Sequence, residues 1–212
     1  MNAPVTVLDY GIGNLLNVVR ALEHCGASVT VLREAPATRT VIDRLVLPGV
    51  GAFGDGMAEL RRRGLDEVVR SFAVTGRPFM GICVGLQMMF DASEEMGENS
   101  GLGLLRGRVR AVPATGADGR PHRIPHIGWR ALEPAADWKD TVLADMPPRE
   151  RVYFVHSFAA EPADPAVRLA DVDYDGVRIC AAVHRDNLYG CQFHPERSGE
   201  AGLRVLQRFL EL

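Results

Sequence analysis

Over its first half, the chain alternates between short apolar runs and stretches in which apolar residues recur with helical spacing. The apolar, β-branched runs predict strands at residues 5–9, 29–32, 44–47 and 78–82. The helical spacing predicts helices at residues 14–24, 57–63, 65–72 and 84–90. Strands that alternate with helices in this way form βαβ units, so we expect a mostly parallel sheet.

The second half of the chain has a different pattern, in which short strands are separated by Pro-, Gly- and Asp-rich turns. Strands are predicted at residues 108–112, 129–132, 153–159 and 167–170, and a β-hairpin at residues 177–183 and 188–193. An amphipathic helix is predicted at residues 199–210. We therefore expect one α/β domain over residues 1–212, with an open, mostly parallel sheet covered by helices on both faces and an antiparallel extension.

Composition and charge narrow the class of protein. The formal net charge of −3 at pH 7 argues against a general nucleic-acid or anionic-membrane binder. No apolar run approaches the ~20 residues that would span a bilayer, and no basic stretch leads into an apolar one at the N-terminus, so we expect a soluble, cytoplasmic protein. The four cysteines form no Cys-x-x-Cys pair, which argues against a zinc ribbon or a dithiol redox site.

One pentapeptide has the pattern of a nucleophile elbow, Gly81-Ile82-Cys83-Val84-Gly85, and it lies between a predicted strand and a predicted helix. The small glycines let the chain turn tightly and direct the Cys83 side chain outward above the edge of the sheet. The helix N-terminus that follows favours a thiolate and a nearby oxyanion. The alternative is a small buried cysteine in an ordinary strand-to-helix turn.

A cysteine nucleophile needs an imidazole base, and His194 is the strongest candidate among the six histidines, because it ends an apolar run and opens His194-Pro195-Glu196. Residues i and i+2 share a face of an extended chain, and Pro195 favours that extended shape before it. Glu196 can then hold one ring nitrogen and leave the other for Cys83. The alternatives are an exposed loop and a metal-binding fragment, although no third ligand has suitable spacing.

Together these motifs resemble those of the class I (triad-type) glutamine amidotransferases. The resemblance rests on Gly-Ile-Cys-Val-Gly-Leu-Gln at residues 81–87 and His-Pro-Glu at 194–196. Four further segments are similar to the glutaminase subunit of imidazole glycerol phosphate synthase. They are Asp-Tyr-Gly-Ile-Gly-Asn at 9–14, Pro-Gly-Val-Gly-Ala-Phe at 48–53, Pro-His-Ile-Gly-Trp at 125–129 and Tyr-Phe-Val-His-Ser at 153–157. The resemblance extends from the first predicted strand to the C-terminus.

This resemblance implies that the chain hydrolyses L-glutamine to glutamate and ammonia, and that it works as a heterodimer with a (β/α)8-barrel cyclase subunit. The cyclase would use the ammonia to make imidazole glycerol phosphate and an aminoimidazole carboxamide ribonucleotide, in histidine biosynthesis. The resemblance implies neither a metal nor an organic cofactor for this subunit, and neither a nucleic acid nor a membrane as a partner.

Residue roles also follow from the resemblance. Cys83, His194 and Glu196 would form the catalytic triad, with a glutamyl thioester on Cys83. The implied oxyanion residues are Gly49, Val50, Gly51 and Val84. The implied substrate-binding residues are Gln87, Glu95 and Ser157. The residues implied to lie at the partner interface, near the passage for ammonia, are Asn14, His126, Trp129, Tyr153, His156 and Arg197.

Some of these roles have alternatives. Instead of binding substrate, Glu95 could be a solvated charge at a helix end. Instead of facing a partner, Trp129 and Tyr153 could belong to a buried aromatic core. The chain also departs from the pattern of the resembled subunit. Arg130 stands where we expect Asn, and Arg197 where Lys is also common.

Three other functions compete with the implied one. A free-standing cysteine hydrolase would use the same elbow without a partner, and robust glutamine hydrolysis by the isolated chain would favour it. A non-catalytic binding subunit would keep the fold, but the intact triad argues against it. A glutaminase that feeds another synthase would share the chemistry, and residues 125–129 and 153–157 argue against that candidate.

Overall fold

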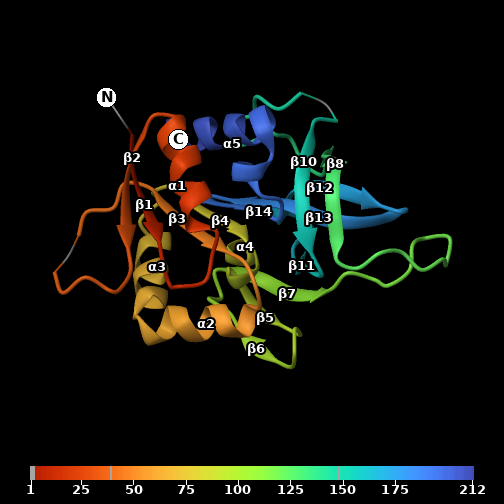
Figure 1. Ribbon diagram of the computed structural model, residues 1–212, viewed down its shortest axis with the longest axis horizontal. Coiled ribbons are helices and arrows are strands. Elements are labelled where there is room, and N and C mark those ends of the chain that lie inside the picture. Colours follow the sequence, from red (N-terminus) through yellow and green to blue (C-terminus); the bar gives the residue numbers. More distant parts are fainter. Residues whose placement is uncertain (1–2, 39, 148) are drawn as a thin grey trace.

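The computed structural model describes residues 3–38, 40–147 and 149–212, and an eight-stranded sheet forms its centre (Figure 1). In spatial order its strands are β2 (Ala27–Leu32), β1 (Ala3–Leu8), β3 (Leu45–Gly49), β4 (Phe79–Cys83), β14 (Leu188–Cys191), β13 (Val177–Arg185), β12 (Arg168–Tyr174) and β9 (Glu133–Pro134). The strands from β2 to β14 are parallel, and β13, β12 and β9 continue the sheet in antiparallel pairs. The expected sheet with its antiparallel extension is therefore confirmed.

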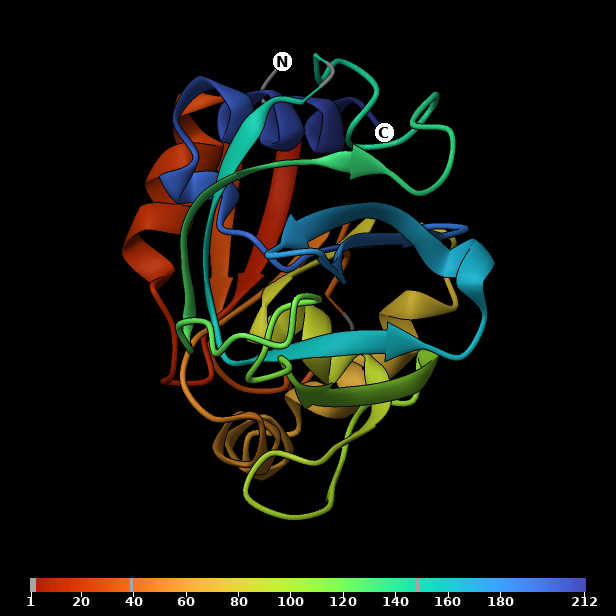
Figure 2. The same ribbon diagram turned by 90° about the vertical axis from the view of Figure 1, so that its right-hand side faces the viewer.

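Helices cover both faces of this sheet. The helices α1 (Leu15–His24) and α5 (Gly199–Glu211) lie on one face, and α2 (Phe53–Arg62), α3 (Leu65–Ala73) and the short α4 (Val84–Met88) on the other. Figure 2 shows α5 (blue) above the sheet, α1 (red) at its left, and α2 (orange), seen end-on, below it. Among the described residues, no helix combines the length and hydrophobicity that crossing a membrane requires.

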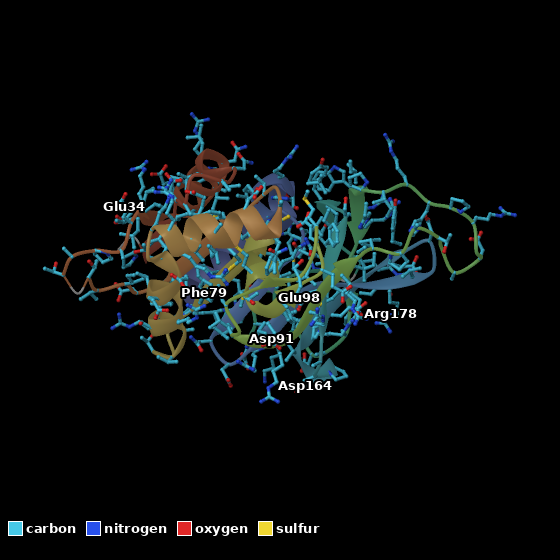
Figure 3. The ribbon with its side chains drawn as sticks, turned by 90° about the horizontal axis from the view of Figure 1, so that it is seen from below. Glu34, Phe79, Asp91, Glu98, Asp164 and Arg178 are labelled. Carbon is cyan, nitrogen blue, oxygen red and sulfur yellow. The ribbon has the colours of Figure 1, made fainter. Side chains whose placement is uncertain are left out.

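The central parallel strands are buried because both of their faces are covered. Every residue of β3 and β4 is buried, as expected for strands between two helical layers. Figure 3 shows Phe79, the first residue of β4, inside the molecule, whereas Glu34 and Asp164 lie at its periphery. The pentapeptide predicted to be catalytic therefore starts in a fully buried strand of the central sheet.

Two smaller sheets pack beside the large one. The first is four-stranded, in the order β11 (Phe158–Pro162), β7 (Leu105–Ala111), β5 (Phe90–Ser93) and β6 (Asn99–Ser100). The second is the antiparallel pair of β8 (His126–Ala131) and β10 (Arg151–His156), which stands near the antiparallel end of the large sheet in Figure 1. Two short 3-10 helices complete the elements, η1 (Pro165–Val167) and η2 (Pro195–Arg197).

Two element predictions were wrong in the same way. The strand expected at residues 153–159 is two strands, because the chain leaves the β8–β10 pair after His156 and enters the four-stranded sheet at Phe158. The helix expected at residues 84–90 ends at Met88, and Phe90 begins β5. Both segments are mostly apolar, and periodicity alone does not mark a boundary inside such a run. The short strands β5, β6 and β9 were not predicted.

Candidate active site

Cys83 lies at a sharp turn where β4 passes directly into α4. Its backbone has φ 54° and ψ −113°, a conformation that residues with a side chain rarely adopt. A Cβ atom on Gly85 would lie 1.8 Å from the carbonyl oxygen of Leu47, and one on Gly81 would lie 2.7 Å from the N–H nitrogen of Leu86. Only glycine fits at either position, which is why the pentapeptide forms this elbow.

The thiol of Cys83 faces a cavity and not open solvent. Only 4% of the residue is exposed, so the expectation of an outward-directed side chain holds only in the sense that it points into this cavity. The cavity has a volume of ≈ 240 Å³, below the ~300–1,000 Å³ of drug-sized ligand pockets, and so suits a small molecule. The residues expected to bind substrate or oxyanion that line it are Val50, Gly51, Val84, Gln87, Glu95 and Ser157.

Gly49, the remaining expected oxyanion residue, lies beneath the elbow. A Cβ atom there would lie 2.7 Å from the backbone nitrogen of Gly85 and 2.7 Å from the hydroxyl oxygen of Tyr10. That hydroxyl donates a hydrogen bond to the carbonyl oxygen of Pro48 at 2.9 Å. The segment before Val50 is thus held close against the nucleophile turn.

His194 and Glu196 form a buried pair beside Cys83. Nδ1 of His194 lies 2.8 Å from Oε1 of Glu196, and their side chains are 3% and 1% exposed. The backbone that brings them together differs from the expectation. His194 itself is extended, but Pro195 starts the 3-10 helix η2, so a tight helical turn and not a strand carries Glu196 back to the ring.

The charge on His194 is set by its two neighbours. Burial alone lowers the pKa of His194, but Cys83 and Glu196 raise it more, and the resulting pKa is about 10. The Nε2 atom, opposite the nitrogen held by Glu196, makes no hydrogen bond of standard geometry within the described part of the chain. An imidazolium ring beside a thiol favours the thiolate, so the arrangement suits nucleophilic chemistry.

Glu95 caps a helix at the far side of the cavity. Its Oε2 accepts a hydrogen bond of 2.8 Å from the backbone N–H of Phe53, the first residue of α2. A carboxylate is stabilised at a helix N-terminus, and the capping contact leaves its second oxygen available for a cationic group. The side chain is half-buried and hydrogen-bonded, and is thus not the freely solvated charge of the alternative.

A buried amide that the motif analysis overlooked also reaches the sulfur. Gln192 is fully buried, and its Nε2 lies 3.7 Å from Sγ of Cys83. Its Oε1 accepts a hydrogen bond from Nε2 of Gln87 at 3.1 Å, and the same nitrogen of Gln87 donates to the carbonyl oxygen of Phe158 at 2.8 Å. The one available signal was its place two residues before His194, which puts both on the same side of an extended chain.

The residues expected at the partner interface divide into two groups. Trp129 is 44% exposed, its ring centroid lies 6.0 Å from that of half-buried Tyr153, and the Arg197 guanidinium lies 4.6 Å from the centroid of the Tyr153 ring. These three, which we call the aromatic patch, are not part of a buried core. In contrast, His126 and His156 are buried and share a 3.0 Å hydrogen bond, so in this chain they offer no surface to a partner.

Two further residues, Asn14 and Arg130, belong to neither of these groups. Asn14, also expected at the interface, is half-buried and directly precedes α1. Arg130, where the sequence departs from the resembled subunit, places its guanidinium 5.5 Å from the centroid of the Tyr174 ring. It therefore packs on the antiparallel end of the large sheet and not on the cavity.

Comparisons with known proteins agree with this geometry. The sequence profile of the family described as "Glutamine amidotransferase class-I" matches residues 6–212. Imidazole glycerol phosphate synthase subunit HisH 1 of Legionella pneumophila (strain Lens) is 51% identical over 211 residues, 98% of this chain and 99% of that protein. Subunit HisH of Geobacillus thermodenitrificans (strain NG80-2) is 44% identical over 206 residues, 97% of this chain and 94% of that protein.

Solved structures share the fold. The structure of PurLQS from Thermotoga maritima superposes with a TM-score of 0.74 at 23% identity, covering 100% of this chain and 99% of that chain. A crystal structure of a glutamine amidotransferase superposes with a TM-score of 0.70 at 20% identity, covering 98% of this chain and 97% of that one. At these identities the similarity establishes the architecture alone.

Proposed function

The chain belongs to the class I glutamine amidotransferase family and, within it, to the HisH subunits of imidazole glycerol phosphate synthase, and we infer that it hydrolyses L-glutamine to glutamate and ammonia. The observation that carries this inference is that Cys83 and His194 line one small cavity, with Glu196 bonded to the His194 ring behind them. The raised pKa of His194, to about 10 against the lowering effect of burial, supports a charged ring beside the nucleophile.

In the proposed reaction, Sγ of Cys83 attacks the side-chain carboxamide carbon of glutamine, and a C–S bond forms. His194 gives its proton to the leaving nitrogen as the C–N bond breaks, so ammonia departs and a glutamyl thioester remains. The neutral ring then takes a proton from water, which attacks the thioester carbon, and the C–S bond breaks with its electron pair returning to sulfur. Glu196 holds the ring in the tautomer that both steps need.

Binding of the substrate is assigned to the other cavity residues. Glu95 would pair its free carboxylate oxygen with the ammonium group of glutamine, because its other oxygen is already committed to α2. Gln87 has both N–H groups engaged, which leaves its carbonyl oxygen for the substrate, and the backbone at Ser157 would line the far wall. Backbone N–H groups of Val50 and Val84, with neighbouring Gly51, would face the tetrahedral oxygen.

We further propose that the aromatic patch of Trp129, Tyr153 and Arg197 binds a cyclase subunit that consumes the ammonia. Two large rings and a guanidinium at the surface are typical of interface hot spots. Asn14 would border this contact, and His126 and His156 would brace it from behind. Cytoplasmic location fits the four free cysteines, because thiols stay reduced there.

The experiment that tests the proposal measures glutamate release from glutamine by the purified chain, alone and with a barrel cyclase. The Cys83→Ala variant should lose hydrolysis in both settings while it still forms the complex on a sizing column. Retained hydrolysis would overturn the assignment of the nucleophile. Equal rates with and without the cyclase would favour a free-standing hydrolase.

A further inference from the structure

The sulfur of Cys83 has a second polar neighbour besides His194. The amide nitrogen of Gln192 lies 3.7 Å from it, within hydrogen-bond distance for sulfur, and Gln192 has no exposed surface. A buried thiolate has lost its water, so it depends on protein N–H groups for stabilisation. The question is whether Gln192 presents its N–H group or its carbonyl oxygen to the sulfur, because the two ends of an amide look alike.

The neighbours of Gln192 decide this orientation. The carbonyl oxygen of Phe158 can only accept hydrogen bonds, so the Gln87 atom at 2.8 Å from it must be the amide nitrogen. The second N–H of that nitrogen points to Gln192 at 3.1 Å, and therefore meets the Gln192 carbonyl oxygen. The amide nitrogen of Gln192 is then the end that faces Cys83.

Two buried imidazoles fix the carbonyl oxygen of Phe158, at which this series of hydrogen bonds begins. Nδ1 of His156 lies 2.9 Å from the same carbonyl oxygen of Phe158, so it carries a proton, and Nε2 of His156 must accept from Nδ1 of His126 at 3.0 Å. Burial lowers the pKa of His156 to about 4 and that of His126 to about 3. Each ring is therefore neutral with one N–H, as this series of hydrogen bonds requires. The carbonyl of Phe158 thus has two donors and a fixed position.

We propose that Gln192 is a further catalytic residue, whose amide N–H donates a hydrogen bond to the Cys83 thiolate, with Gln87 as the positioning residue that fixes the direction of that amide. Its catalytic part rests on the proposed glutaminase function. A neutral donor keeps its proton throughout, whereas His194 gives its proton to the leaving ammonia. Gln192 therefore stabilises the sulfur both before attack and when the C–S bond of the thioester breaks and the electron pair returns to sulfur.

The first test is the pH profile of alkylation of the full chain by iodoacetamide, followed on the peptide that contains Cys83. In Gln192→Met, which keeps the size but removes the N–H, the midpoint of the profile should rise by about one pH unit. Gln192→Glu keeps the acceptor for Gln87 but places a carboxylate at the sulfur, so its midpoint should rise further. Gln87→Met, which frees the amide of Gln192 to rotate, should give a smaller rise.

The matched control is Cys191→Ala, a change at the adjacent, equally buried residue that leaves the amide in place, and its midpoint should equal that of the unchanged chain. His194 and Tyr10, whose pKa values Cys83 helps to raise, are the same in every variant. A midpoint in Gln192→Met within a few tenths of a pH unit of the control would overturn the proposal. If Gln192→Met shows a clear rise but the unchanged chain hydrolyses no glutamine, alone or with a cyclase, the proposed function fails and the hydrogen bond stands.

A second measurement needs no change at Gln192, and decides the matter if those variants fail to fold. In the ¹⁵N NMR spectrum of the full chain, the side-chain amide signals of Gln192 should move with pH through the same midpoint as the alkylation rate. In Cys83→Ala this movement should disappear. Amide signals that do not respond to the titration of Cys83 would refute the contact.

Discussion

Glu196→Gln is the most informative single change at the candidate site, because it keeps the shape of the side chain and removes only its charge. Glu196 and His194 are buried together, and Glu196 is one of the two groups that raise the pKa of His194 to about 10 against the effect of burial. A neutral amide no longer favours the imidazolium ring and does not select one tautomer. In a serine-protease triad the corresponding change lowers kcat by about 10⁴-fold. We expect a loss between about 10² and 10⁴ here, seen mainly in kcat.

The same variant tests the charge state through stability. The pKa of His194 is raised above its ordinary value of 6.5, so the pair contributes stability that is fully present below about pH 6.5 and is lost as pH rises through about 10. Each pH unit by which the pKa of His194 falls costs about 1.4 kcal/mol, and breaking a buried pair outright costs about 3–5 kcal/mol. We expect a destabilisation of about 1–3 kcal/mol at pH 6, which a domain of ordinary stability survives.

Urea unfolding of both chains at pH 6 and above pH 10, together with glutaminase assays, measures these quantities. The destabilisation should shrink toward zero at the higher pH. Glu200→Gln is the control, because it makes the same chemical change on a 90% exposed side chain and should alter stability by less than about 0.5 kcal/mol. A destabilisation that does not vary with pH, or a kcat within tenfold of the unchanged chain, would refute the charged pair.

Three further predictions follow from the geometry. A glutamine-like electrophile should label one cysteine per chain, Cys83, because burial raises the pKa of Cys180 to about 12 and also raises that of Cys191. A second labelled cysteine in the peptide map would contradict this. Trp129→Ala should weaken cyclase binding by at least about 30-fold in Kd without changing the melting temperature. If titration calorimetry gives the same Kd for the variant and the unchanged chain, Trp129 does not belong to the interface. Val50→Pro removes one expected oxyanion donor and should lower the kcat of the complex by about 10²–10³, and an unchanged kcat would exclude that N–H.

Several features of the site were within reach of the sequence. The elbow at Cys83 is a local structure, because the contacts that exclude a Cβ atom at Gly81 include the backbone of the helix that directly follows. The hairpin of β13 and β14 and the parallel strands β1 to β4 are also local patterns of turn residues and apolar runs, and each was found. The spacing within His-Pro-Glu was sufficient to predict that His194 pairs with Glu196. It did not predict the 3-10 turn that joins them.

Other features depended on the tertiary structure, because they arise where segments far apart in the sequence meet. Residue spacing alone cannot place the amide of Gln192 on the sulfur of Cys83, since the two lie 109 positions apart and meet only because β14 pairs with β4. The change of sheet at Ser157 and the burial of His126 and His156 likewise depend on which sheet each strand joins. Apolar periodicity reports that a strand is buried, but not its neighbours, and a site built from several strands is decided by that order.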